Sequence, residues 1–257
     1  MRLALATTTW RRPVLTDLVL EQVARVRDEL ADVLDLELVA VGSEGAASRE
    51  AAERHGWRYI EHDNRPVGAK HNRAAAEARA LEVEGLIVIG SDDVVNAGWI
   101  EAMAGELAHG VDVSGPSGVP FFQTVGDDAG RLGVGCEIRG LGHPLARCAR
   151  PMASWGAGRI YSRRLLEALD WAPWSPARNR GLDASAWTRA ELALPGFEAT
   201  AIEPTPRACF VDVKTDVGIT EWHKLAPLLE WVDDPSDWLV PAFGVEVTDR
   251  IVRLAHR

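Results

Sequence analysis

Two adjacent aspartates, Asp92 and Asp93, follow a short and strongly apolar segment, residues 86–89. Only Gly90 and Ser91 separate this segment from Asp92. Neighbouring carboxylates repel one another, so keeping both ionised requires a nearby cation. Carboxylate oxygens suit Mg²⁺ or Mn²⁺, which also take phosphate oxygens as ligands. The pair therefore predicts a divalent-metal site that bridges the protein to a diphosphate. The alternative is that both aspartates only cap the helix expected after them.

Three more polar segments end predicted strands. TTTWRR, GSEG and EHDN close strand-like stretches over residues 3–8, 36–41 and 57–60. In an open α/β sheet, ligands bind at the carboxyl ends of the parallel strands. We therefore expect the four polar segments to meet at one edge of a sheet. Turn and capping roles would explain the Ser, Thr and Asn residues but not the paired aspartates.

The elements that position these segments alternate between strand-like and helix-like patterns along residues 1–115, which predicts βαβ units and a mainly parallel sheet. Residues 116–257 are rich in glycine, proline and short strand-like stretches, which predicts an irregular second half. The first half is expected to hold strands over 3–8, 36–41, 57–60, 86–89 and 111–114, and helices over 13–30, 46–55, 71–83 and 96–109. The second is expected to hold helices over 162–169 and 182–192, β-like stretches over 197–203 and 208–213, and a helix or loop from 236 onward.

Composition limits the class of protein. Hydrophobic residues make up 47% of the 257 residues and charged residues 26%, which excludes a disordered or fibrous chain. Three cysteines at unrelated spacings exclude a disulfide scaffold and a Cys-rich zinc site, and they fit a reducing compartment. No apolar run approaches the roughly 18 residues that span a bilayer, and the N-terminus does not fit a signal peptide. We therefore expect a soluble, cytoplasmic α/β protein that does not bind a membrane.

Charge is unevenly distributed. The net charge is −10, but residues 131–189 contain ten arginines and only four acids, which leaves that stretch at +6 and the remainder at −16. Arginine-rich segments in acidic proteins favour recognition of phosphate or another anion. The alternative is that these arginines pair with acids elsewhere in the fold.

The strand-end motifs resemble those of GT-A fold glycosyltransferases, close to the family-2 type. The resemblance rests on TTTWRRP, VAVGSEG, NRPVGAKHNRAAAEA and LIVIGSDDVVNAGWIEAM. In that family a helix with a G-x-K/R-x-N pattern precedes an apolar strand that ends in a D-x-D-like motif. The resemblance implies one GT-A domain over 1–257, with a Rossmann-like sheet in a nucleotide-sugar half over 1–115. An irregular acceptor half and a C-terminal tail would occupy 116–257.

The resemblance also implies a set of donor-binding residues. Lys70 would act as a counter-charge to phosphate, and Ser43 and Glu44 stand where the family often has acids that read the base. The full donor set is Thr7, Thr9, Arg11, Ser43, Glu44, Lys70, Asn72, Ser91 and Asp92.

By the same resemblance, Asp93 is the principal ligand of a Mn²⁺ or Mg²⁺ ion, and Asp92 lies beside it. His223 stands where GT-A enzymes often place a late metal or diphosphate contact, although it could equally lie on a surface helix. The common motif has a further aspartate where this chain has Gly90, which leaves one ribose or metal contact unassigned.

Asp183 begins a predicted helix after NRGL. The family usually places an acid there, facing the donor sugar, so Asp183 is the candidate base that takes the proton from an acceptor hydroxyl. The alternative is a helix N-cap.

Together these features imply a metal-dependent glycosyltransferase that moves a sugar from a nucleotide-diphosphate donor to a hydroxyl with inversion. The short chain is similar to glycosyltransferases encoded by bacteriophages, whose acceptors can be modified DNA bases or proteins; a small-molecule acceptor is also open. Two alternatives stay open as well. One is a catalytically silent module that binds a nucleotide or glycan. The other is a nucleotidyltransferase, although TTTWRRP lacks the glycines usual in the first loop of such enzymes.

Overall fold

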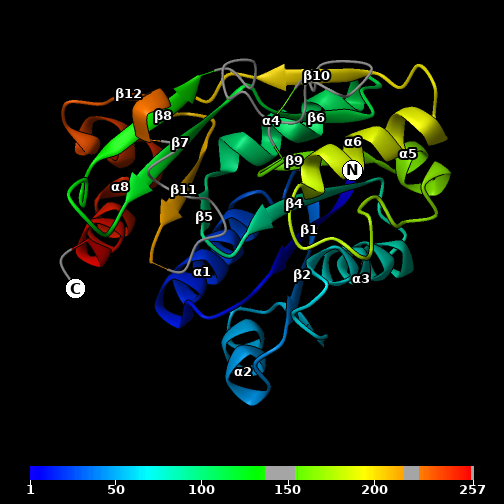
Figure 1. The fold of residues 1–257 in the computed structure, drawn as a ribbon, viewed down its shortest axis with the longest axis horizontal. Coiled ribbons are helices and arrows are strands. Elements are labelled where there is room, and N and C mark those ends of the chain that lie inside the picture. The colour runs from blue at the N-terminus through cyan, green and yellow to red at the C-terminus, as the bar shows by residue number, and fades with distance from the viewer. Residues whose placement is uncertain (137–153, 155, 217–225, 256–257) are drawn as a thin grey trace.

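The computed structural model describes residues 1–136, 154, 156–216 and 226–255. Its larger sheet has seven strands in the order β10-β6-β9-β4-β1-β2-β3 (Figure 1). Strands β1, β2, β3 and β4 pair in parallel, β10 pairs in parallel with β6, and β9 runs antiparallel to β4 and β6. The predicted mainly parallel sheet is confirmed. The strands are β1 Arg2–Thr8, β2 Asp35–Gly42, β3 Arg58–Glu61, β4 Gly85–Gly90, β6 Val113–Pro116, β9 Arg159–Ser162 and β10 Ala199–Ile202.

A second sheet, which sequence reasoning did not predict as a unit, has the order β12-β8-β7-β11-β5. Strands β7, β8 and β12 lie on the left of Figure 1, away from the parallel strands at its centre. Strand β5 begins at Asp93, the second of the paired aspartates, where no strand was expected, and it pairs antiparallel with β11. The strands are β5 Asp93–Val95, β7 Gly118–Gln123, β8 Leu132–Cys136, β11 Phe210–Lys214 and β12 Leu229–Trp231.

The helices follow the apolar periodicity of the sequence closely. Pro13 opens the first helix, and Leu15, Leu18, Val19 and Val23 form its buried face. The helices are α1 Pro13–Glu29, α2 Ala46–Arg54, α3 Val67–Ala80, α4 Ala97–Ala108, α5 Arg163–Ala168, α6 Leu182–Ala193 and α8 Pro235–Leu254, with a 3₁₀ turn over Ala226–Leu228. None of the helices in the described residues is long and apolar enough to cross a membrane.

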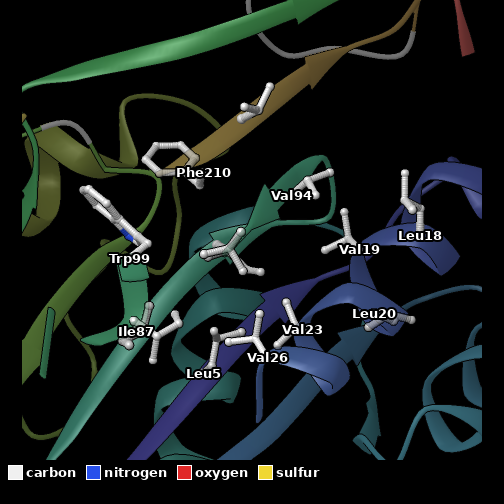
Figure 2. Packing of buried hydrophobic residues seen from close by; sticks show 14 of the residues in the cluster. Leu5, Leu18, Val19, Leu20, Val23, Val26, Ile87, Val94, Trp99 and Phe210 are labelled. Atoms are coloured by element: carbon white, nitrogen blue, oxygen red, sulfur yellow. The ribbon is translucent and has the colours of Figure 1, made fainter. Parts of the chain in front are cut away.

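One apolar cluster joins the two sheets (Figure 2). Leu5 of β1 and Ile87 of β4 belong to the same cluster as Val23 of α1, and so do Val94 of β5 and Phe210 of β11. All five side chains are buried, and each buried side chain of this size contributes about 1.5–3 kcal/mol. This packing fixes β5 and β11 against the parallel sheet and thereby positions the polar residues at their ends.

Helix α3 begins one turn earlier than the predicted 71–83, at Val67. The loop before α6 supplies the reason, because Asn179 Oδ1 accepts the Val67 N–H at 3.1 Å and the Arg178 carbonyl accepts the Gly68 N–H at 2.9 Å. These bonds satisfy amide groups that a helix leaves unpaired at its N-terminus. The division of the chain into halves over 1–115 and 116–257 stays a prediction, although β9 and β10 complete the sheet built by the first half.

Candidate functional site

Three carboxylates meet where β4 leads into β5. Oxygens of Asp92, Asp93 and Asp212 lie within 4.8 Å of one another. The β5–β11 pairing places Asp212 directly opposite Asp93. Sequence reasoning missed Asp212; the available signal was an acid inside the apolar run FVDV. The capping alternative for Asp92 and Asp93 is wrong, because Asn96 caps α4 by accepting the Trp99 N–H at 3.0 Å.

Burial makes this carboxylate cluster electrostatically costly. Asp93 is 2% exposed and Asp212 is 8% exposed. Burial, followed by repulsion from Asp212 and Asp92, raises the pKa of Asp93 well above its usual range. Burial likewise raises the pKa of Asp212, against the opposing effect of Lys214. A cation beside the cluster would oppose this shift and favour the ionised form of Asp93.

The carboxylate cluster has the donor set of a hard divalent cation. Asp212 Oδ1 is buried and has no hydrogen-bond partner among the residues that the structure describes. Asp93 Oδ2 accepts the Gly90 N–H at 2.5 Å, which orients the carboxylate. An oriented carboxylate and an unpartnered buried carboxylate oxygen fit Mg²⁺ or Mn²⁺.

An aspartate at position 90, where the family motif would place one, would require Asp92 to move. A Cβ at this position would lie 2.4 Å from Asp92 Oδ1. The third carboxylate of the cluster comes instead from Asp212 on β11. His223, the other predicted metal contact, lies outside the described residues.

Two basic side chains already contact the carboxylate cluster. Arg12 Nη1 forms an ion pair with Asp92, and Arg12 Nη2 donates to Ser91 Oγ at 3.3 Å. Lys214 Nζ lies 2.5 Å from Asp212 Oδ2. Ser91, predicted to contact the donor, is buried and contacts Arg12. The ion pairs partly offset the repulsion among the acids.

Lys70 joins three of the predicted polar strand ends. Its Nζ donates to the Thr9 carbonyl at 2.7 Å, to Ser43 Oγ at 3.2 Å and to Asn64 Oδ1 at 3.1 Å. These acceptors follow β1, β2 and β3, so the expected convergence is confirmed for three of the four polar segments. Lys70 is 1% exposed, and burial lowers the pKa of its ammonium group to about 8. In this structure Lys70 binds protein oxygens; its contact with phosphate stays a prediction.

The other residues predicted to bind the base and ribose line the same edge. Glu44 Oε1 accepts the backbone N–H of Arg11 at 2.9 Å and holds it at a φ of 52°. The Arg11 guanidinium stacks 4.8 Å from the centre of the Trp10 ring. The hydroxyls of Thr7 and Thr9 are buried without a hydrogen-bond partner among the described residues. Unpaired buried hydroxyls are costly. Because Thr7 and Thr9 are only 1% and 2% exposed, their contact with a donor stays a prediction.

A pocket of about 90 Å³ adjoins the carboxylate cluster at Gly90 and contains Asp183. Asp183 lies in the first turn of α6, whose N-cap is Gly181, so the N-cap alternative for Asp183 is wrong. His71 and Trp174 line the same pocket, with ring centres 5.0 Å apart. Burial lowers the pKa of His71 to about 4, so its imidazole is neutral at neutral pH.

Asn72 fixes one wall of this pocket. Its side chain donates to the Trp174 carbonyl at 2.8 Å and accepts the Trp174 N–H at 3.0 Å. Asn72 thereby holds the backbone of Trp174, which lines the pocket together with Asp183. Its predicted contact with the donor stays a prediction.

We expect Asn72→Ala to lower the free energy of unfolding by about 1–3 kcal/mol, because both backbone groups of Trp174 lose their partner. Urea unfolding followed by circular dichroism measures the change. The matched control is Arg73→Ala, which breaks only an i,i+4 ion pair with Glu77 and should cost about 0.3–0.5 kcal/mol. Equal losses in the two variants would contradict a structural role for the Asn72 contacts.

We expect Gly156→Ala to displace the carboxylate of Asp183, since the new Cβ would lie 1.8 Å from Asp183 Oδ1. Misplacing a reacting group by about 1 Å can cost on the order of 10²-fold in rate. Steady-state turnover of a nucleotide sugar, with nucleotide affinity measured in parallel, separates a loss of kcat from a loss of binding.

Gly105→Ala is the control, because a Cβ at this position in α4 meets nothing within 4 Å. It should leave turnover unchanged and stabilise the protein by about 0.5–1 kcal/mol. Unaltered turnover in Gly156→Ala would show that the position of Asp183 does not matter.

A second group of possible metal ligands already forms ion pairs with arginines. Asp17, Glu21 and His55 also lie close enough to hold a metal, but Arg54 pairs with Asp17, and Arg25 and Arg250 pair with Glu21.

Within the arginine-rich stretch, Arg159 is buried, Arg163 pairs with Glu167 and Arg164 pairs with Asp112. These three arginines serve the fold, which weakens the argument from charge for a polyanionic acceptor.

Comparison with known proteins supports the same architecture. No protein-family model and no curated protein sequence matches the chain. Among solved structures, residues 1–349 of S. aureus TarS in complex with UDP-GlcNAc are similar, with a TM-score of 0.59 at 16% identity over 85% of this chain. TarS 1–349 in complex with UDP gives 0.54 at 14% identity over 87% of this chain and 68% of TarS 1–349. The chain has a GT-A fold.

The GT-A fold predicted from the motifs is thus confirmed, and it places the carboxylate cluster and the Asp183 pocket at the carboxyl end of β4. The chain spans 60% of the length of TarS 1–349 in the UDP-GlcNAc complex. At this identity the likeness establishes the fold alone.

Proposed function

We propose that the chain is a glycosyltransferase that depends on Mg²⁺ or Mn²⁺ and transfers a sugar from a nucleotide-diphosphate donor to a hydroxyl, with inversion. The observation that carries the proposal is the juxtaposition of the Asp92, Asp93 and Asp212 carboxylates with the Asp183 pocket, both of which reach Gly90. A site for the diphosphate and a site for the attacking hydroxyl must adjoin in this way for a direct displacement.

The three aspartates would hold the metal ion. When bound, a divalent cation supplies positive charge that stabilises the leaving diphosphate. The nucleoside part of the donor would lie along the edge formed by Thr7, Thr9 and Ser43, which Lys70 ties together. TarS binds UDP-GlcNAc and UDP, which supports a donor of this class and makes UDP-GlcNAc the first donor to test.

Asp183 would remove the proton from the acceptor hydroxyl as its oxygen attacks the anomeric carbon from the side opposite the diphosphate. One bond forms between the acceptor oxygen and the anomeric carbon, and the bond to the diphosphate oxygen breaks. Neutral His71 leaves Asp183 free of a competing cationic neighbour within the pocket, and Trp174 offers an aromatic face to the sugar. The acceptor is a hydroxyl compound; modified DNA bases, proteins and small molecules are the classes to test.

The direct test measures release of nucleoside diphosphate from UDP-, GDP- and dTDP-sugars with Mn²⁺, with Mg²⁺ and with EDTA. We expect slow hydrolysis of one donor that requires the metal and accelerates when a suitable acceptor is added. Donor binding without turnover on any acceptor would support a binding module. Pyrophosphate release from a nucleoside triphosphate would support a nucleotidyltransferase.

A further inference from the structure

Arg12 and Lys214 each pair with one carboxylate oxygen of the cluster, Arg12 with Asp92 Oδ2 and Lys214 with Asp212 Oδ2. Arg12 contacts Asp92, and both side chains are 15% exposed. Lys214 contacts Asp212, with exposed fractions of 10% and 12%. An oxygen paired with a guanidinium or ammonium group is less available to a metal ion, and the two cations repel an arriving one.

The charges of the carboxylate cluster indicate what must change when ligands arrive. Two basic side chains face three aspartates, so the fully ionised cluster carries one unbalanced negative charge. A divalent cation alone would exceed that charge. A metal ion that binds together with a diphosphate brings positive and negative charges of similar size, so the net charge of the site changes little. Both basic side chains then keep an anionic partner.

Arg12 is placed to change partner. It is the residue before Pro13, at the turn between β1 and α1, next to the predicted nucleotide edge at Thr9. Its Nε is buried and has no hydrogen-bond partner among the described residues, so part of the guanidinium is unused. Guanidinium groups bind phosphate oxygens in a bidentate manner. Lys214 is held more firmly, because Nζ also lies 5.1 Å from the centre of the buried Phe121 ring.

We propose that Arg12, assisted by Lys214, is a resident counter-ion of the carboxylate cluster that releases Asp92 to the metal and then pairs with the diphosphate of the donor. Metal and nucleotide therefore bind cooperatively, each strengthening the binding of the other. This inference rests on the proposed function. It assigns Arg12 a role in coupling the two ligands. Arg12 belongs neither to the donor-binding residues nor to the metal ligands predicted from the sequence.

The test titrates Mn²⁺ and follows free Mn²⁺ by electron paramagnetic resonance, with and without UDP, in wild type and in Arg12→Gln. In wild type, UDP should tighten Mn²⁺ binding on the order of tenfold or more, within the usual range of coupling between sites. Arg12→Gln should bind Mn²⁺ more tightly than wild type when UDP is absent. It should also bind UDP more weakly at saturating Mn²⁺, so that the coupling factor falls several-fold.

Two further variants keep the inference falsifiable. Arg12→Lys retains a charge beside Asp92, so its affinity for Mn²⁺ without UDP should stay close to that of wild type. Arg79→Gln breaks an exposed pair with Asp170 outside the site and should change neither affinity.

Weaker Mn²⁺ binding by Arg12→Gln, or an unchanged coupling factor, would overturn the inference while leaving the proposed function in place. Absence of Mn²⁺ and UDP binding in folded wild-type protein would overturn both.

Discussion

Replacing Asp93 by Asn should abolish metal-dependent turnover, with a loss of at least about 10³-fold in kcat/KM, while leaving the protein as stable as wild type. Asn has nearly the shape of Asp, and its carbonyl oxygen can still accept the Gly90 N–H that Asp93 accepts. The substitution removes a buried carboxylate that burial and two acidic neighbours disfavour. Loss of activity without loss of stability is the expected signature of a strained functional group.

Asp212→Asn provides the contrast. It should also abolish turnover, but it leaves Lys214 without the carboxylate that lies 2.5 Å away. Removing one partner of a largely buried ion pair typically costs on the order of 3 kcal/mol. Thermal unfolding together with release of nucleoside diphosphate measures both effects.

Asp127→Asn, at an exposed position after β7, is the control and should be neutral in both measurements. Full activity in Asp93→Asn would exclude the metal role of the carboxylate cluster. A stable Asp212→Asn variant would contradict the electrostatic description of the Lys214 pair.

Asp183→Asn should lower kcat by about 10²–10⁴-fold and leave the dissociation constants of Mn²⁺ and the nucleotide unchanged. The amide cannot take a proton from the acceptor, whereas the metal and donor contacts do not involve Asp183. Steady-state kinetics together with calorimetric nucleotide binding separates the two effects. The anomeric configuration of the product, read by NMR, should be opposite to that of the donor.

Asp237→Asn is the matched control, since Asp237 also lies in the first turn of a helix, α8, but away from the pocket. Each substitution removes a similar favourable interaction with a helix N-terminus, worth about 0.3–1 kcal/mol. Equal activity in the two variants would show that Asp183 only stabilises the helix and that another residue is the base.

Local patterns in the sequence were enough to predict most helices and strands of residues 1–115. Strand β4 was predicted correctly from its apolar run, and α1 from its periodic apolar face, because each element buries a regular set of side chains. The convergence of strand ends around Lys70 also followed, since parallel strands bring their carboxyl ends to one edge.

Features that depend on contacts between distant segments could not be predicted from the sequence. Strand β5 has only three residues and exists because it pairs with β11, far along the chain, so no local period marks it. Asp212 joined the site through that pairing. The early start of α3 likewise depends on Asn179 in a distant loop. The close approach of Asp92 Oδ1 to Gly90 is likewise visible only in the structure.

Anomalous diffraction from crystals soaked with MnCl₂ and UDP-GlcNAc tests directly whether the three aspartates hold a metal ion beside the donor diphosphate. We predict one manganese peak among Asp92, Asp93 and Asp212, with the diphosphate on its open side and the sugar directed toward Asp183. A nucleotide bound elsewhere, or bound here with no manganese at the carboxylates, would contradict a metal-dependent donor site at this edge of the sheet.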